Sequence, residues 1–123
     1  MERNAAQEKA IHHSSGPMML LAGPGSGKTT TMIRRIRALL SEQHINPANI
    51  LVVTFTKAAA REMKERFEKL CEKEGEQQNY RQVTFGTFHG IFYGILRHAY
   101  GLSRNNIISE ERRYDMLKEI VYA

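Results

Sequence analysis

A nine-residue stretch, AGPGSGKTT at positions 22–30, constrains the fold of this chain more than any other segment. Its three glycines and one proline can neither fill a core nor form a regular element. The apolar run PMMLLA (17–22) leads directly into it and predicts a short buried strand. Residues 28–43 follow it with apolar side chains at helical spacing. The expected inner face of that helix consists of Met32, Ile33, Ile36, Leu39 and Leu40.

The rest of the 123-residue chain alternates the same two kinds of element. Apolar runs predict two more strands, and helical patterns predict four more helices. The alternation favours an α/β fold, in which helices flank a parallel sheet. The expected order is helix, strand, helix, strand, helix, strand, helix, helix. The strands added here are 50–55 and 82–88, and the helices are 3–15, 57–76, 89–100 and 109–123.

Local signals mark several helix ends. Asn4 and Gln7 have the spacing of a capping box at the start of the first helix. Gly101 is placed to end the helix over 89–100, and Ser109 to begin the last one. The single cysteine, Cys71, lies in an apolar helical pattern, so we expect it to pack in the core.

Composition excludes several classes of protein. One cysteine rules out an internal disulfide framework, and no apolar run reaches membrane-spanning length. The charged and polar opening, MERNAAQEKA, is not a secretory signal, which favours a cytoplasmic protein. Lysine and arginine number 18 against 13 acidic residues, a net charge of +5. This balance favours a polyanionic partner.

The loop at 22–30 has the chemistry of a phosphate cradle of the P-loop (Walker A) type. Glycines allow successive backbone N–H groups to point inward, and the following helix adds the positive end of its dipole. Lys28 can reach the β- and γ-phosphates, and Thr29 can offer its hydroxyl to Mg²⁺. The expected nucleotide-binding residues of this segment are Ala22, Gly23, Pro24, Gly25, Ser26, Gly27, Lys28, Thr29 and Thr30.

Two features depart from a complete P-loop NTPase. The usual pattern places glycine at position 22, where this chain has the small residue Ala22. No acidic residue ends the apolar runs at 50–55 or 82–88, although Mg²⁺ needs one. We therefore expect the front part of something longer, which binds nucleotide without hydrolysing it efficiently. Its incomplete sheet is expected to expose apolar surface and to favour self-association.

Four segments resemble, in order and spacing, the opening motifs of superfamily 1 DNA helicases of the UvrD/Rep/PcrA type. They are RNAAQEKAI, AGPGSGKTT, VTFTKAAAREMKERF and FGTFHGIFYGILR, and the resemblance covers about positions 3–122. It implies a RecA-like fold, incomplete here: residues 1–105 would begin the ATP-binding domain 1A, and 106–123 the helical subdomain 1B. It also implies ATP, Mg²⁺, single-stranded DNA and the remaining helicase domains 1B, 2A and 2B as ligands and partners.

The resemblance assigns roles in nucleotide binding. Gln7 matches the glutamine that reads adenine, since an amide can meet the N7 and N6 edge together. The alternative is that Gln7 only caps its helix. Lys28 and Thr29 match the catalytic phosphate lysine and the Mg²⁺ hydroxyl. Thr30 stands where relatives often carry arginine beside the base, which predicts weaker affinity or base selectivity.

The resemblance also assigns contacts with single-stranded DNA. Phe55 would stack on a base at the end of its strand, which tolerates any sequence. A buried core position for Phe55 is the open alternative. Thr56 and Lys57 would contact phosphate, with lysine replacing the commoner asparagine at 57. Thr87 and His89 belong to a second DNA-contacting loop, in which the histidine contacts the backbone of the DNA.

Other interpretations stay open at this point. A small P-loop kinase would explain the cradle but not TFTKAAA or GTFHG, and a truncated adaptor could bind nucleotide or DNA without catalysis. Lys64, Arg66 and Lys69 are expected to lie on the solvated face of their helix.

Overall fold

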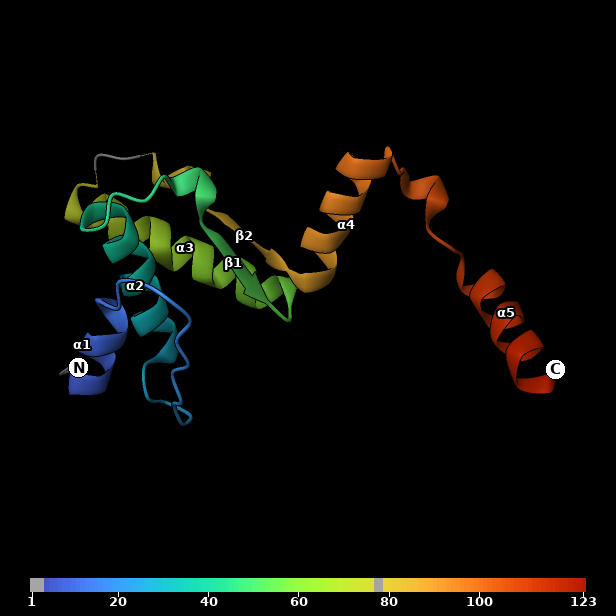
Figure 1. The fold of residues 1–123 in the computed structure, drawn as a ribbon, viewed down its shortest axis with the longest axis horizontal. Helices are drawn as coiled ribbons and strands as arrows, with labels where there is room; N and C mark the ends of the chain where they lie inside the picture. Colours follow the sequence, from blue (N-terminus) through green and yellow to red (C-terminus); the bar gives the residue numbers. More distant parts are fainter. Residues whose placement is uncertain (1–3, 77–78) are drawn as a thin grey trace. The chain divides into compact units, whose positions relative to one another are not determined.

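The structure is a computed structural model that describes residues 4–76 and 79–123 (Figure 1). The chain divides into two compact units, one ending at Phe88 and one comprising His89–Ala123. Within the described ranges, no helix is long and apolar enough to cross a membrane.

The first unit contains three α-helices and two strands among its described residues. Each expected helix of this part forms, although the first ends at Ile11 and does not continue to position 15. The capping box is confirmed: Asn4 Oδ1 accepts from the Gln7 N–H at 2.9 Å, and Gln7 Oε1 accepts from the Asn4 N–H at 3.1 Å. The elements are α1 Ala5–Ile11, α2 Lys28–Ser41, β1 Leu51–Thr54, α3 Lys57–Glu74 and β2 Thr84–Thr87, with single 3-10 turns at Pro47–Asn49 and Tyr80–Gln82.

The sheet of the first unit is parallel, as expected, and has two strands in the described chain. β1 and β2 pair in register from Leu51 with Thr84 to Thr54 with Thr87. Helix α3 connects them and packs along both strands (Figure 1). The carboxyl ends of the two strands therefore lie next to each other at one edge of the sheet.

The core lies between α2, α3 and the sheet. Phe67 and Cys71 of α3 are fully buried, which confirms the packing role expected for the cysteine. The Phe67 ring lies 5.6 Å from the Phe85 ring, between centroids. The expectation for Met32 is wrong, because its side chain is 43% exposed. The core comprises Ile33, Ile36, Leu40, Ile50, Val52, Met63, Phe67, Cys71 and Val83.

The strand expected at 17–22 is not formed. These residues carry no regular structure, and Met19 and Leu21 are 84% and 86% exposed. A strand exists only when its backbone groups pair with a neighbour, and β1 and β2 pair only with each other in the described chain. The apolar pattern of this segment is real, but the described residues provide no partner for it.

The second unit contains α4 Phe88–Tyr100, whose first residue lies at the boundary, and α5 Glu110–Tyr122. Gly101 has φ +62° after α4, and Ser109 Oγ accepts from the Arg112 N–H at 3.2 Å, so both expected helix-end residues are confirmed. No residue of either helix is buried. Apolar side chains such as Phe92 and Ile120 are exposed on these helices, whereas the expectation from the sequence concerned the sheet. The domain boundary at 105/106 stays a prediction.

Candidate nucleotide and nucleic-acid site

The glycine-rich loop forms a tight turn before α2. The Ser26 N–H and the Ser26 hydroxyl both donate to the Gly23 carbonyl, at 3.3 and 2.6 Å. Gly25 and Gly27 have φ of +71° and +80°, a region that side chains disfavour. Gly23 lies outside that region, so glycine is required by the backbone at two of the three positions.

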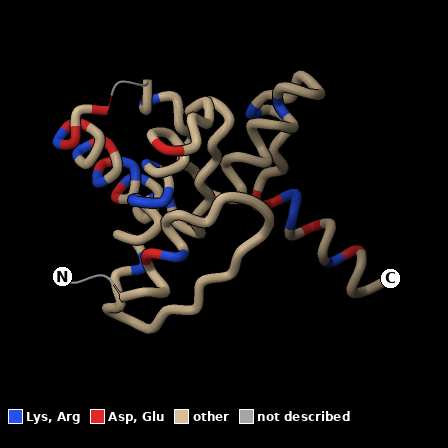
Figure 2. The backbone as a smooth tube through the Cα atoms, turned by 60° about the vertical axis from the view of Figure 1, so that its left-hand side comes forward, with Lys and Arg blue, Asp and Glu red and all other residues tan. Residues whose placement is uncertain are grey.

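Helix α2 begins at Lys28 with an N-terminus that no side chain caps. The segment from His13 to Gly27 carries no Lys, Arg, Asp or Glu and is tan in Figure 2, so Lys28 is the first charge beyond the loop. Its side chain is exposed, whereas Thr29 is half-buried in the same turn. An uncapped helix start beside a lysine provides both N–H donors and positive potential for an anion.

Thr31 is a residue that sequence reasoning missed. It is buried, and its hydroxyl donates to the Gly27 carbonyl at 3.0 Å, alongside the backbone bond from its own N–H at 2.9 Å. Threonine hydroxyls commonly bond to the carbonyl four residues earlier. These two bonds hold the end of the loop, at Gly27, against the first turn of α2. The position of Thr31, three residues after Lys28, is the sequence signal that could have identified this role.

A pocket of about 190 Å³ lies between the loop and α1. It brings together Gln7 and Lys28, which are 21 positions apart in the sequence. Whole small-molecule sites typically have volumes of about 300–1,000 Å³, so this pocket can enclose only part of a nucleotide. The lining residues are Asn4, Ala6, Gln7, Leu20, Leu21, Ala22, Gly23, Ser26, Lys28 and Thr31.

The Gln7 amide connects α1 to the loop. Its nitrogen donates to the Ser26 carbonyl at 2.6 Å, while its oxygen accepts from the Asn4 N–H. An amide has two N–H donors and two acceptor lone pairs. The capping bond uses one acceptor and the bond to Ser26 uses one donor, so one donor and one acceptor remain for a further ligand. Capping and adenine recognition therefore do not exclude each other.

Phe55 is exposed at the carboxyl edge of the sheet. Its side chain is 90% accessible, so the alternative of a buried core position is wrong. The Phe55 ring lies 5.3 Å from the Phe88 ring and is tilted by 44° to it. Thr56 caps α3 through its hydroxyl oxygen, which accepts from the Ala59 N–H at 3.1 Å.

A groove of about 260 Å³ runs along α3 beside β2. Lys57, Arg61 and Lys64 line it from α3, and Thr87 lines it from the end of β2. These three cations form no ion pair within residues 4–76 and 79–123. We call them the basic stripe of α3. Arg61 was not singled out from the sequence, although the spacing of four and then three residues from Lys57 is that of one helix face.

The other predicted residues lie elsewhere. Arg66 is on a different face of α3, where it pairs with Glu62 at 3.5 Å, and Lys69 is exposed, as expected of a solvated face. His89 is exposed in the first turn of α4, two residues after β2 ends, and belongs to the second unit.

The described residues contain no group of three His, Cys, Asp or Glu side chains that could hold a metal ion. Thr29, half-buried in the first turn of α2, carries the hydroxyl that the sequence assigns to Mg²⁺. Mg²⁺ usually keeps several waters and binds phosphate oxygens together with few protein groups. The site therefore fits Mg²⁺ that arrives with a nucleotide and not a dedicated protein cage.

Comparison with known proteins gives a consistent result. A family model described as "UvrD/REP helicase N-terminal domain" matches residues 3–122. Proteins named ATP-dependent DNA helicase PcrA from Staphylococcus aureus and Bacillus subtilis are each 38% identical over 122 residues, and one from Staphylococcus epidermidis is 37% identical. The match covers 96% of this chain and 16% of each relative. The chain belongs to the UvrD/REP helicase N-terminal domain family.

Proposed function

We propose that this chain is the ATP-binding segment of an ATP-dependent DNA helicase and also supplies part of its track for single-stranded DNA. The relatives named ATP-dependent DNA helicase PcrA support this, although the chain spans only 16% of their length. The α/β order and parallel pairing agree with the RecA-like fold that the resemblance implies. The pocket that joins Gln7 to the glycine-rich loop and Lys28 is the observation that carries the proposal.

In nucleotide binding, each residue has a distinct task. The N-terminal N–H groups of α2 and the Lys28 ammonium bind the phosphates, where their positive potential is concentrated. The Thr29 hydroxyl would hold Mg²⁺, and the ion would neutralise negative charge on the phosphates of the nucleotide. Gln7 contacts adenine with the remaining donor and acceptor of its side-chain amide. Neither described strand ends in an acidic residue that could act with Thr29, so the chain alone is expected to bind ATP without hydrolysing it efficiently.

In DNA binding, the exposed Phe55 ring stacks on a base, and Thr56 and Lys57 contact the phosphate backbone. Thr87 of β2 and the basic stripe of α3 extend this contact along the groove. His89 contributes a further backbone contact from the start of α4. Stacking with phosphate contacts is indifferent to sequence, as movement along a strand requires.

The test separates the two ligands by substitution. Lys28→Ala is expected to abolish binding of an ATP analogue and leave binding of an oligothymidine strand within about twofold, because the lysine contacts phosphate of the nucleotide alone. Phe55→Ala is expected to weaken oligothymidine binding about tenfold or more through lost stacking and to leave nucleotide binding unchanged. Titrations by fluorescence anisotropy measure both affinities.

Thermal unfolding of both variants controls for misfolding. Loss of both ligands in each variant would contradict a two-site arrangement. Sustained, DNA-stimulated ATP hydrolysis by the 123-residue chain alone would contradict the proposal that this chain binds ATP without hydrolysing it efficiently. Phosphate transfer to a small acceptor would instead support the kinase alternative.

A further inference from the structure

Helix α1 carries Gln7, yet it is too short to hold its own position. It has seven residues, and isolated helices shorter than about 12–15 residues are marginal in water. Its position on the molecule is therefore set by contacts with other elements. Ala10 and Ile11 at its end are each only 3% exposed, which shows where α1 is anchored.

The last turn of α1 is held by Arg35 of α2. The Arg35 Nη1 donates to the Ala10 carbonyl at 2.9 Å and to the His13 carbonyl at 2.8 Å. The final carbonyls of a helix have no partner within the helix, and a cation there also complements the helix dipole. Arg35 thus satisfies groups that α1 cannot satisfy itself.

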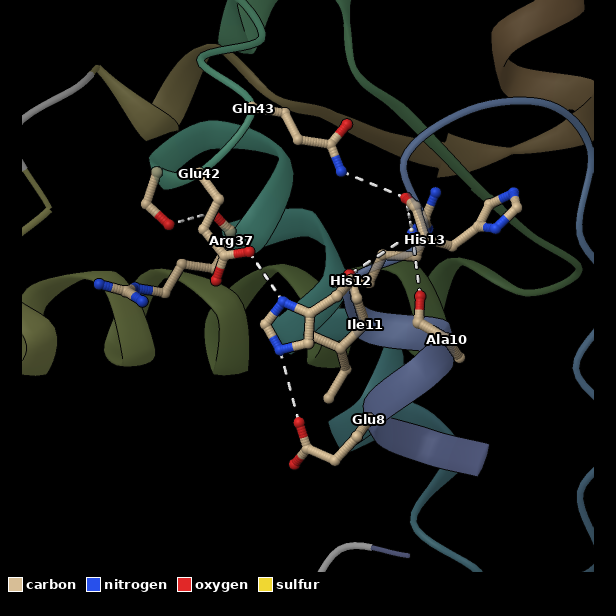
Figure 3. A network of polar contacts seen from close by, with 10 residues as sticks. Glu8, Ala10, Ile11, His12, His13, Arg37, Glu42 and Gln43 are labelled. Atoms are coloured by element: carbon tan, nitrogen blue, oxygen red, sulfur yellow. Dashed lines mark hydrogen bonds and ion pairs between the residues drawn. The ribbon is translucent and has the colours of Figure 1, made fainter. Parts of the chain in front are cut away.

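Three further contacts support the same end of α1 (Figure 3). Gln43 Nε2 donates to the His13 carbonyl at 3.2 Å. The His12 ring lies between Glu42, 2.8 Å from its Nδ1, and Glu8, 3.4 Å from its Nε2. His12 and Glu42 are both half-exposed, so their contact contributes less stability than the part-buried bonds of Arg35.

The same helix α2 begins at Lys28 and carries Arg35 two turns later, about 10 Å along the axis at 1.5 Å per residue. Gln7 lies one turn before Ala10 on α1. The position of the Gln7 amide relative to Lys28 therefore depends on how Arg35 fixes α1 on α2. At the opposite end, the bond from Gln7 to the Ser26 carbonyl completes the connection.

We infer that Arg35 is a positioning residue for base recognition: through the end of α1 it places the Gln7 amide against the nucleotide base. The inference rests on the proposed function, because it takes nucleotide as the ligand of the pocket. Arg35 is not among the residues that line the pocket. Its effect is on the choice between adenine and guanine, whose edges present different donors and acceptors.

The experiment compares the affinities of the 123-residue chain for ATP and GTP analogues. Wild type is expected to prefer the ATP analogue. In Arg35→Ala that affinity falls about tenfold, the scale of a lost or misplaced hydrogen bond, while affinity for the GTP analogue stays within about twofold. Arg35→Lys keeps a donor and is expected to retain part of the preference.

Arg34→Ala is the matched control. Arg34 is the neighbouring residue on α2, but its guanidinium pairs with Glu74 of α3 at 3.6 Å and not with α1. The preference for ATP should survive in this variant. Thermal unfolding is measured for each protein. Should Arg35→Ala fail to fold, Gln43→Ala removes a second donor to the same carbonyl and is expected to lower the preference by a smaller factor.

The outcomes separate the inference from the function on which it rests. If wild type binds neither analogue, the proposed nucleotide site is wrong and the inference fails with it. If wild type binds both equally, or if Arg35→Ala and Arg35→Lys weaken both in the same proportion, nucleotide binding stands and Arg35 has only a structural role.

Discussion

At the scale of single residues, the glycines of the loop differ in what they contribute. Gly25 has φ +71°, whereas Gly23 has no positive φ, and a Cβ built at either position meets no atom within 4 Å. Space is therefore equal at the two positions, and only the backbone conformation differs.

Gly25→Ala is expected to lower the free energy of unfolding by about 1 kcal/mol, the cost of a left-handed conformation for a residue with a Cβ. Gly23→Ala should change it by less than about 0.5 kcal/mol, and restriction of the unfolded chain could make the change favourable. Urea denaturation of the chain without nucleotide measures both. Equal losses in the two variants would show that the loop is not held in the conformation described.

Cys71 provides a second prediction at this scale. Burial, and next to it the negative charge of Glu76, raise the pKa of the thiol from 9.0 to about 12. The thiolate is the reactive form, so alkylation by iodoacetamide at pH 8 is expected to be far slower in the folded chain than in urea. Rapid labelling of the folded chain would mean that α3 opens readily around this residue.

The same pKa has a consequence for stability. Because the pKa is raised in the folded state, the folded chain holds a proton that the unfolded chain releases above pH 9. The contribution of the buried, protonated thiol to the free energy of unfolding is complete below pH 9. It is lost between pH 9 and about 12, by up to about 1.4 kcal/mol per pH unit. In Cys71→Ala the free energy of unfolding should change less with pH in this range than in wild type. The comparison of the two proteins removes the contribution of the other titrating groups, which they share.

At the scale of elements, α3 has faces with different charge environments. Figure 2 shows basic and acidic positions interleaved along this helix. The basic stripe lines the groove without ion pairs among the described residues, whereas Arg66 is paired with Glu62. Unpaired cations in a groove are the ones available to phosphates.

The double substitution Arg61→Ala and Lys64→Ala is expected to weaken oligothymidine binding and to reduce its dependence on salt. Each cation that contacts a single strand contributes about 0.7 to the slope of log K against log salt, so the slope should fall by about 1.4. Arg66→Ala is the control from the same helix and should leave the slope unchanged. If Arg66→Ala lowered the slope as much as each of the other two substitutions does, binding would depend on the net charge of the chain and not on the groove.

The elements also show what a sequence can predict. Helices α1 to α5 were predicted because periodicity and caps are local properties, as Asn4 with Gln7 and Ser109 illustrate. The prediction of a strand at 17–22 is wrong, because strand pairing depends on residues far away in the sequence, about which a local apolar pattern carries no information. In the site, the glycines and Lys28 follow from their spacing. Arg35 does not, since its carbonyl partners become neighbours only when α1 packs on α2.

At the scale of the whole molecule, the two units differ in how their helices are supported. α2 and α3 bury Leu40, Phe67 and Cys71 in a shared core. α4 and α5 have thirteen residues each and bury none. A helix of that length draws little stability from propensity alone and depends on packing.

Hydrogen exchange is therefore expected to divide the chain at the unit boundary. Amides of 57–74 should be protected by nearly the full free energy of unfolding, whereas those of 89–100 and 110–122 should exchange orders of magnitude faster. Mass spectrometry of peptides at two protein concentrations measures both. Protection of α4 and α5 that rises with concentration would show that exposed side chains such as Phe92 and Ile120 pack in a self-associated form. Strong protection at both concentrations would contradict this expectation, because the described residues of α4 and α5 include none that is buried.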